Sequence, residues 1–414
     1  MAPDSTLRRI GIVDQSSTGW AAAALYSRML LCSLSAACDD TGIELYFLSP
    51  PASDGQSPGQ SNAKSIQLTP VEYFPGERPV RGLFGLGEKS RPFRGESRLR
   101  NLLRLSDKSD LFSVAHEHGI DVLLPLLDVA PWTIPQKTIG WVPDFQHVYL
   151  PQFFDQAELD HRNNTIHRLA ERATLVMLSS KASRDDFIAF APHHAHKARV
   201  ASFPSFLAFE ALDENPLATL NKFRLPEKFA LLANQFWAHK NHIVVVRALE
   251  LLHKKGIDIR VVMTGLPADR RDPSNRNLSL LLQAIASADL NSRISVLGLV
   301  PYPDLINLMR MAALIIQPSR FEGWGTVVQD AKALGRPVMC SDIPVHREQA
   351  PEALGFFGCD DAEALADLLA THWKSLEPGP NLDREATALA AERDFAQRHG
   401  QTLLEICREA CGQN

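Results

Sequence analysis

The sequence predicts an α/β protein with two doubly wound domains, each built on a parallel sheet. The chain has 414 residues, which is more than one ordinary domain holds. Short apolar runs alternate with helix-compatible segments through both halves, as in successive βα units. Residues 206–226 mix acidic residues, prolines and helix formers between the two series, and we interpret them as a hinge.

The bulk composition is that of a soluble globular protein. Hydrophobic residues make up 45% of the chain and charged residues 22%. The net charge of −5 gives no reason to expect nucleic-acid binding. No run of 18 apolar residues occurs, and the N-terminus lacks the apolar core of a signal peptide, so we expect a cytoplasmic protein. Six scattered cysteines, without a Cys-x-x-Cys pair, are expected to be reduced thiols.

Apolar runs place the strands of both series. In the first half we expect a helix over residues 21–37, a mobile surface loop over residues 50–65, and strands at residues 9–14, 44–48, 121–125, 138–142 and 174–179. In the second half we expect a helical end from residue 384 to residue 411, and strands at residues 229–233, 259–263, 294–297, 314–316 and 337–339. Ligands should bind at the carboxyl ends of these strands.

The most informative segment runs from the apolar residues 312–317 through a Glu-Gly-Trp-Gly loop into a helical pattern that ends at Gly335. A strand, a glycine loop and a helix N-terminus together form an anion site, because the first helical N–H groups have no partner within the helix. Glu322 at the loop entrance would repel a phosphate, but a carboxylate suits sugar hydroxyls. The combination suggests a nucleotide-sugar site. The alternative is that Glu322 only caps the helix.

This order of residues resembles the retaining glycosyltransferases of family 4, whose GT-B fold has two Rossmann-like domains facing a cleft. Their hallmark is two Glu residues separated by seven others, and here the positions hold Glu322 and Asp330. The segments 335–338 and 341–348 also fit the family pattern. The resemblance implies that Glu322 contacts the donor sugar and that Asp330, one methylene shorter than Glu, contacts the ribose.

A second loop, residues 234–242, directly follows the first strand of the second half. Lys240 is the one cation of this loop that stays charged at neutral pH, and an ammonium suits a diphosphate leaving group. Together with the amides of Gly323, Gly325 and Thr326, it would stabilise the charge that grows as the sugar–phosphate bond breaks. The family usually has Gly-Arg before this lysine, whereas this chain has Gln235. The alternative is an exposed surface lysine.

The resemblance assigns further residues on the donor and acceptor sides. Leu299 and Val300 would line the pocket for the base. Thr18 and Gly19, at the first strand–helix turn, would approach the donor phosphate. Asp144, after the strand at residues 138–142, would position the acceptor or the donor sugar, and His147 would reach the same cleft; the alternative is that His147 is structural. The expected catalytic residues are Lys240, Glu322, Asp144 and His147; the expected donor-binding residues are Thr18, Gly19, Gln235, Lys240, Leu299, Val300, Glu322, Gly323, Trp324, Gly325, Thr326, Val327 and Asp330.

From this resemblance we expect an N-terminal acceptor domain over residues 1–205, the hinge over 206–226, a C-terminal donor domain over 227–383, and a final segment, 384–414, that packs back on the first domain. No cofactor or metal is expected, because His239 and His242 lack a third ligand at suitable spacing.

The expected activity is transfer of a hexose from a UDP- or GDP-linked donor to a hydroxyl of a glycan, glycolipid or lipid-linked acceptor, in surface polysaccharide synthesis. The Arg-rich segment 78–104 is either a solvated face or a contact with a phosphate-bearing acceptor or anionic lipid at the inner face of the membrane. Two alternatives stay open: a nucleotide-sugar epimerase or hydrolase, and a non-catalytic nucleotide-sugar binder. A dehydrogenase is disfavoured, since Gly-x-Gly-x-x-Gly is absent after the first strand.

Overall fold

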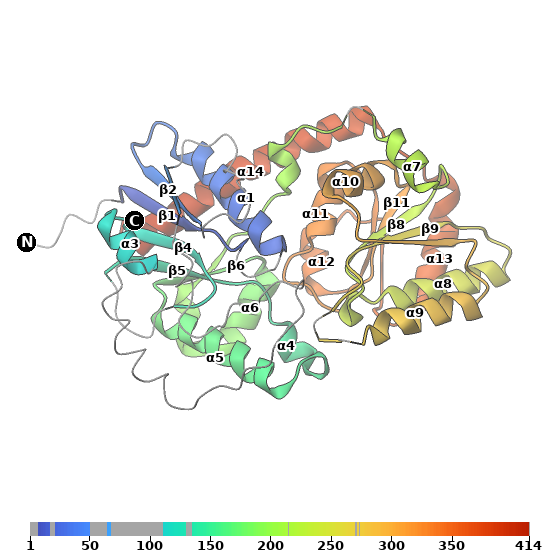
Figure 1. The fold of residues 1–414 in the computed structure, drawn as a ribbon, viewed down its shortest axis with the longest axis horizontal. Coiled ribbons are helices and arrows are strands. Elements are labelled where there is room, and N and C mark those ends of the chain that lie inside the picture. Colours follow the sequence, from blue (N-terminus) through green and yellow to red (C-terminus); the bar gives the residue numbers. More distant parts are fainter. Residues whose placement is uncertain are drawn as a thin grey trace, which may run out of the picture. The chain divides into compact units, whose positions relative to one another are not determined.

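The structure is a computed structural model that describes residues 7–16, 21–49, 64–67, 111–129, 135–213, 215–269, 271–272 and 274–413. Its strands form two sheets (Figure 1). The strand order is β3-β2-β1-β4-β5-β6-β7 in one sheet and β10-β9-β8-β11-β12-β13 in the other. The pairings of the second sheet are all parallel, as are those of β1 with β2 and β4, of β2 with β3, and of β6 with β7. The predicted fold class, two Rossmann-like parallel α/β sheets, is confirmed.

The strands of the first sheet are β1 (Arg9–Val13), β2 (Glu44–Ser49), β3 (Lys64–Gln67), β4 (Val122–Leu126), β5 (Lys137–Val142), β6 (Leu175–Leu178) and β7 (Ala198–Val200). The strands of the second are β8 (Ala230–Ala233), β9 (Val261–Thr264), β10 (Ile294–Gly298), β11 (Leu314–Gln317), β12 (Val338–Ser341) and β13 (Gly355–Phe357). The predicted strands lie within one or two residues of those observed. The short strands β3, β7 and β13 were not predicted.

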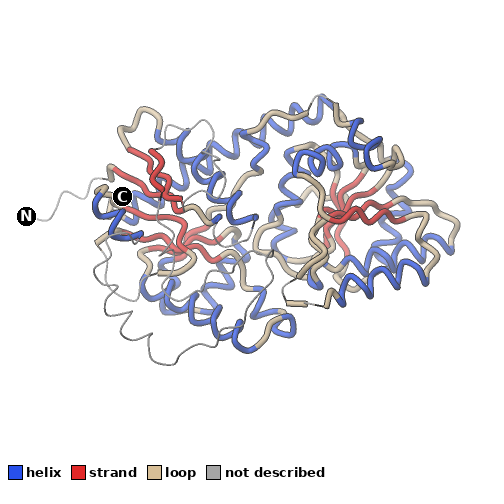
Figure 2. The backbone as a smooth tube through the Cα atoms, in the orientation of Figure 1, coloured by secondary structure: helices blue, strands red, loops and turns tan. Residues whose placement is uncertain are grey.

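Helices connect the strands in both sheets (Figure 2). The α-helices are α1 (Ala21–Cys38), α3 (Leu111–Glu117), α4 (Gln146–Tyr149), α5 (Gln156–Arg172), α6 (Lys181–Phe190), α7 (Leu217–Phe223), α8 (His242–Lys254), α9 (Arg276–Ser287), α10 (Tyr302–Met311), α11 (Thr326–Ala333), α12 (Pro344–Gln349), α13 (Ala362–His372) and α14 (Leu382–Ala410). Short 3-10 helices are η3 (Pro151–Phe153), η4 (Pro192–Lys197), η5 (Phe206–Phe209), η6 (Ala238–Lys240) and η7 (Trp373–Ser375).

The core of the six-stranded sheet shows why its central strands are mostly apolar. Successive side chains of a strand point to opposite faces, and both faces of this sheet are covered. In β8, Ala230 and Leu232 belong to the cluster that includes buried residues of α8, α9 and α13. Leu231 and Ala233 belong to the opposite cluster, with buried residues of α7, α10 and α11. A strand buried on both faces leaves its carboxyl end and the following loop as the place for polar chemistry.

The chain forms two compact units by its internal contacts. One unit holds residues 1–126, 130–139 and 407–414, and the other holds residues 127–129 and 140–406. The domain boundaries predicted at residues 205, 226 and 383 remain a prediction. The segment expected to be a hinge contains η5 and α7.

Three predictions fall on residues outside those described. They are Thr18 and Gly19, the Arg-rich segment 78–104, and residues 50–63 of the expected surface loop, whose last two residues, Lys64 and Ser65, instead begin β3. In the described part of the chain, no helix has both the length and the apolar character that a membrane span requires.

Candidate functional site

Two of the predicted residues lie at the switch point of the six-stranded sheet. The order of its strands reverses between β8 and β11, and ligands of open parallel sheets bind beside the carboxyl ends of strands at such a point. The loop after β8 contains Lys240, and the loop after β11 contains Glu322. Every predicted site residue that the structure describes belongs to the unit that holds residues 140–406.

Lys240 and Glu322 form an ion pair there. Lys240 Nζ lies 2.6 Å from Glu322 Oε1, and the two side chains are only 14% and 10% exposed. Gln317, the last residue of β11, donates from Nε2 to the same carboxylate oxygen at 2.9 Å. Asn234, the first residue after β8, donates to Gln317 Oε1 at 2.9 Å and so joins the two loops. Lys240 is therefore not an exposed surface lysine, and Glu322 does not cap α11, whose N-cap residue is Gly325.

The histidines beside this pair are held neutral. Burial lowers the pKa of His239 well below its usual value, and the nearby charge of Lys240 lowers it further. Burial also lowers the pKa of His242 to about 4 and lowers the pKa of His346. A buried imidazole gives up its proton because the charged form loses its hydration. The loop after β8 thus brings the side chain of Lys240 beside imidazoles whose pKa values are lowered.

Gly323 allows the loop after β11 to approach the loop after β5. A Cβ built at Gly323 would lie 1.9 Å from the carbonyl oxygen of Pro143 and 3.0 Å from Asp144 Cβ. Such contacts are impossible for any other residue without a movement of backbone. Tyr149 stacks on Phe321 between the same two regions, with ring centroids 5.3 Å apart. The predicted donor-side and acceptor-side segments are thus in direct contact.

The amide of Gly325 already has a partner. Its N–H donates to Gln349 Oε1 at 3.1 Å, and Gln349 Nε2 donates back to the Gly325 carbonyl at 2.8 Å. The predicted phosphate contact of this amide would require Gln349 to move. Thr326 is exposed at the first position of α11, where unpaired helical N–H groups gather. Trp324 donates from Nε1 to the Phe203 carbonyl at 3.0 Å.

Asp330 lies against the residues at the end of the first series of strands. Its Oδ1 accepts a hydrogen bond from Ser205 Oγ at 2.6 Å. The pKa of Asp330 is raised to about 7, chiefly by burial and also by the nearby carboxylates of Glu392 and Glu210, while the Ser205 hydrogen bond acts in the opposite direction. The predicted ribose contact would replace or share the bond to Ser205.

The acceptor-side residues are close in sequence but have different surroundings. Asp144 Oδ1 accepts from the Gln146 amide at 2.9 Å and lies 3.8 Å from Arg162 Nη1, so it is ordered next to a cation. His147 is 2% exposed, with Nε2 at 3.2 Å from Asn163 Oδ1. Burial lowers its pKa, and the neighbouring charge of Arg162 adds to this effect. Asp144 thus keeps a polar, ordered carboxylate, whereas His147 is a packed, neutral imidazole.

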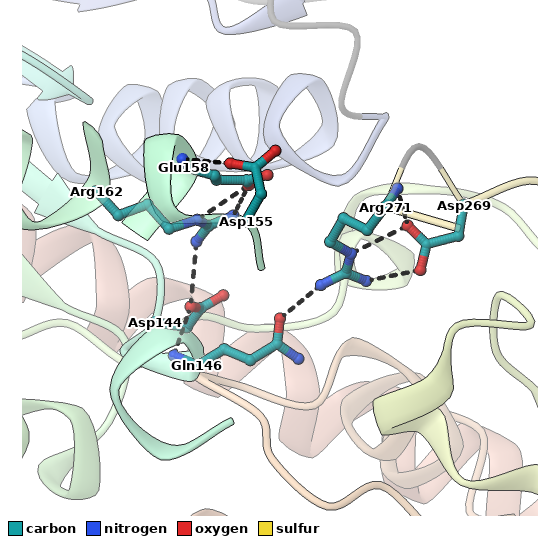
Figure 3. A network of polar contacts seen from close by, with 7 residues as sticks. All are labelled: Asp144, Gln146, Asp155, Glu158, Arg162, Asp269 and Arg271. Atoms are coloured by element: carbon teal, nitrogen blue, oxygen red, sulfur yellow. Dashed lines mark hydrogen bonds and ion pairs between the residues drawn. The ribbon is translucent and has the colours of Figure 1, made fainter. Parts of the chain in front are cut away.

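Arg271 was not singled out from the sequence. It follows β9 and donates from Nη1 to Gln146 Oε1 at 3.0 Å, while Asp269 binds its Nε and Nη2 (Figure 3). Figure 3 also shows Arg162 between Asp144 and the acidic pair Asp155 and Glu158. The only signal in the sequence is the pair of charges Asp269 and Arg271 in a loop after a strand, a position that faces ligands in these folds.

The remaining predicted donor residues are placed as follows. Leu299, just after β10, is 66% exposed, and Val300 is 8% exposed. Gln235 and Val327 are half-buried. A Cβ at Gly265 would lie 2.1 Å from the Asn234 carbonyl oxygen, so this glycine brings the loop after β9 against the loop that holds Lys240. Thr18 and Gly19 lie outside the described residues.

The part of the chain that contains the second series of strands is similar to a known family. Residues 220–382 match the family described as glycosyl transferases group 1. The O-antigen chain mannosyltransferase B of Escherichia coli is 24% identical over 242 residues, which span 57% of this chain and 60% of that protein.

Solved structures match over nearly the whole chain. A glycosyltransferase from Rickettsia africae superposes with a TM-score of 0.60 at 16% identity and covers 98% of this chain and 99% of its own. The Anabaena protein HepE in complex with UDP superposes with a TM-score of 0.58 at 16% identity, over 97% of this chain and 98% of its own. The chain therefore has the GT-B fold seen in glycosyltransferase structures, and residues 220–382 are similar to the group 1 glycosyl transferases.

Proposed function

We propose that the protein is a retaining glycosyltransferase that moves a hexose from a nucleoside diphosphate sugar to a hydroxyl of a glycan or glycolipid. The observation that carries the proposal is the nearly buried pair of Lys240 and Glu322 at the switch point, within the segment that matches group 1 glycosyl transferases. The complex of the Anabaena neighbour with UDP supports a nucleotide donor. We place the diphosphate at Lys240 and the sugar at Glu322.

The proposed role of Lys240 follows from the charge that develops on the leaving diphosphate. As the bond between the sugar and the diphosphate breaks, negative charge accumulates on the diphosphate, and an already ordered cation stabilises that charge without reorganisation. Lys240 has three N–H donors, of which one serves Glu322, so two can face phosphate oxygens. The carboxylate of Glu322 accepts from sugar hydroxyls. The acceptor hydroxyl attacks the anomeric carbon of the sugar on the same face from which the diphosphate leaves. An oxygen of the departing diphosphate takes the proton of that hydroxyl.

Asp144 is proposed to position the acceptor or the donor sugar, because its carboxylate is ordered beside the glycine loop. We propose that no metal ion takes part, since Lys240 supplies the charge that a divalent cation would otherwise provide. Treatment with EDTA should then leave the rate of transfer unchanged.

The acceptor and the cellular place are inferred from the relatives and from charge. The name of the Escherichia coli relative points to O-antigen chains, so we propose an acceptor in surface polysaccharide synthesis. We propose that transfer occurs on the cytoplasmic side of the membrane and that the Arg-rich segment 78–104 contacts a phosphate-bearing acceptor or anionic lipid there.

The test is to follow nucleoside diphosphate release from UDP-, GDP- and dTDP-hexoses with and without glycan acceptors, and to read the anomeric configuration of the product by NMR. Acceptor-dependent release with retained configuration is the expected result. Release without an acceptor would show a hydrolase, a changed sugar would show an epimerase, and binding without turnover would show a binder. Lys240→Ala should abolish release, whereas the exposed control Lys254→Ala should not affect it.

A further inference from the structure

The surroundings of Arg271 fix its side chain in one orientation and suit it to bind an anion. Its side chain is 12% exposed, and its guanidinium lies over two aromatic rings, 5.0 Å from the centroid of Trp237 and 5.3 Å from that of Phe154. Asp269 accepts from Nε and Nη2 at 3.0 and 3.1 Å and fixes the plane of the guanidinium. An arginine fixed in this way loses little conformational freedom when it binds a further ligand.

One of the hydrogen bonds that Arg271 donates goes to a weak acceptor, the side-chain amide oxygen of Gln146. A guanidinium has five N–H donors, and the bonds to Asp269 and Gln146 use three of them. The acceptor on Nη1 is the neutral amide oxygen of Gln146, at 3.0 Å. A phosphate oxygen forms a charge-assisted bond that is roughly twice as strong as one to a neutral group. Phosphate would therefore displace Gln146.

Arg271 contacts the loop that contains Lys240. Trp237, which the guanidinium covers, stands three residues before Lys240 in the same loop. The charges of Lys240 and Arg271 both reach His239. A diphosphate carries more than one negative charge, so the single ammonium of Lys240 leaves part of that charge without a cationic partner.

We propose that Arg271 is a donor-binding residue, which exchanges its bond to Gln146 for oxygens of the donor diphosphate and supplies the second cation beside Lys240. Asp269 then acts as the residue that positions the guanidinium. This inference rests on the proposed function, because it assumes a nucleoside diphosphate at the switch point.

The experiment is isothermal titration of the nucleoside, monophosphate and diphosphate of whichever base the wild-type protein binds. The variants are Arg271→Ala, Arg271→Lys and Gln146→Ala. The matched control is Arg347→Ala, because Arg347 is also held by one aspartate, with Nε and Nη2 at 2.7 and 2.8 Å from Asp342, and also covers a ring, Phe356 at 4.0 Å.

Arg271→Ala is expected to weaken diphosphate binding by about 10- to 100-fold, the effect of losing hydrogen bonds between charged groups, with nucleoside affinity within about twofold of wild type. Arg271→Lys should recover part of the loss, and Gln146→Ala should bind the diphosphate at least as well as wild type. Arg347→Ala should match wild type.

Two results would overturn the assignment while leaving the proposed function intact. One is wild-type diphosphate affinity in Arg271→Ala. The other is an equal loss for nucleoside and diphosphate in Arg271→Ala and also in Gln146→Ala, which would show that the bond between them only holds two loops together. If the wild-type protein binds no nucleoside diphosphate at all, the proposed function fails first, and the assignment fails with it.

Discussion

At the scale of single residues, the ion pair of Lys240 and Glu322 should make a measurable contribution to stability, because both side chains are nearly buried. Removing one partner of a nearly buried ion pair leaves the other charge without compensation. We expect Lys240→Ala to lower the free energy of unfolding by about 3 kcal/mol, and Lys240→Met combined with Glu322→Gln to regain much of that loss. Urea unfolding followed by circular dichroism measures both.

The control for this prediction is the exposed pair of Lys254 and Glu250, whose atoms are also 2.6 Å apart but whose side chains are 67% and 39% exposed. Lys254→Ala should change the stability by less than about 0.5 kcal/mol, because water screens an exposed pair. Equal losses in the two single variants would contradict the view that Lys240 and Glu322 form a desolvated site.

Asp330 should make stability depend on pH in an unusual direction. Its pKa is raised in the folded protein to about 7, so between the unfolded pKa near 3.8 and pH 7 the folded state binds more protons than the unfolded state. The contribution of Asp330 to stability therefore falls as pH rises from about 4 to about 7. Asp330→Asn removes this dependence.

The expected result is that the stability of Asp330→Asn relative to wild type rises between pH 4 and pH 7, by at most about 4 kcal/mol, and stays level above pH 7. Chemical unfolding at a series of pH values measures the difference. Asp367→Asn, at a side chain that is 74% exposed, is the control and should show a level difference throughout. A level difference for Asp330→Asn would show that its carboxyl is ionised in the folded protein at acidic pH.

At the scale of elements, the contact between the loops after β5 and β11 depends on Gly323. Gly323→Ala would place a methyl group 1.9 Å from the Pro143 carbonyl oxygen, so one backbone must move. We expect a loss of about 1–3 kcal/mol in stability, together with weaker donor binding, because the displaced loop also holds Glu322.

Gly358→Ala is the matched control, because its methyl group would meet only the Asp361 side chain, at 3.2 Å. It should cost less stability than Gly323→Ala and leave donor binding unchanged. Differential scanning calorimetry with and without nucleoside diphosphate distinguishes the two variants. An unchanged melting temperature for Gly323→Ala would show that these loops are not held in contact.

Apolar runs were sufficient to predict the central strands, because a strand buried on both faces has few polar residues. The strands that the sequence did not predict are short and lie at sheet edges, as with β7 and β13, where three residues give no periodic pattern. The long helical end was predicted from its periodicity and is observed as α14. Strands could thus be predicted where both of their faces are buried, and helices where a periodic pattern extends over many residues.

Site residues could be predicted only where a single loop has a recognisable sequence pattern. Glu322 and Lys240 stand in recognisable loops after strands, and the structure pairs them. Arg271 and Gln146 are 125 positions apart, and each alone resembles an ordinary polar loop residue. Asp330 and the Gly325 amide likewise have partners, Ser205 and Gln349, that are distant in the sequence. These contacts form only in the folded chain and could not be predicted from a local pattern.

At the scale of the whole molecule, the described candidate residues fall in one compact unit, although the chain folds as two. A donor nucleotide is therefore expected to stabilise the unit that holds residues 140–406 directly. A ligand that binds only the folded state at about 100 times its Kd stabilises it by about 2.7 kcal/mol.

The donor site can be tested by measuring the thermal stability of the pure protein with UDP, GDP, dTDP, NAD or buffer alone. The measurement is repeated for Lys240→Ala, Glu322→Ala and the exposed control Lys254→Ala. One nucleoside diphosphate is expected to raise the melting temperature of wild type and Lys254→Ala, and Lys240→Ala is expected to lose this response. No response of the wild-type protein to any diphosphate, or stabilisation by NAD alone, would refute a nucleoside diphosphate site at Lys240.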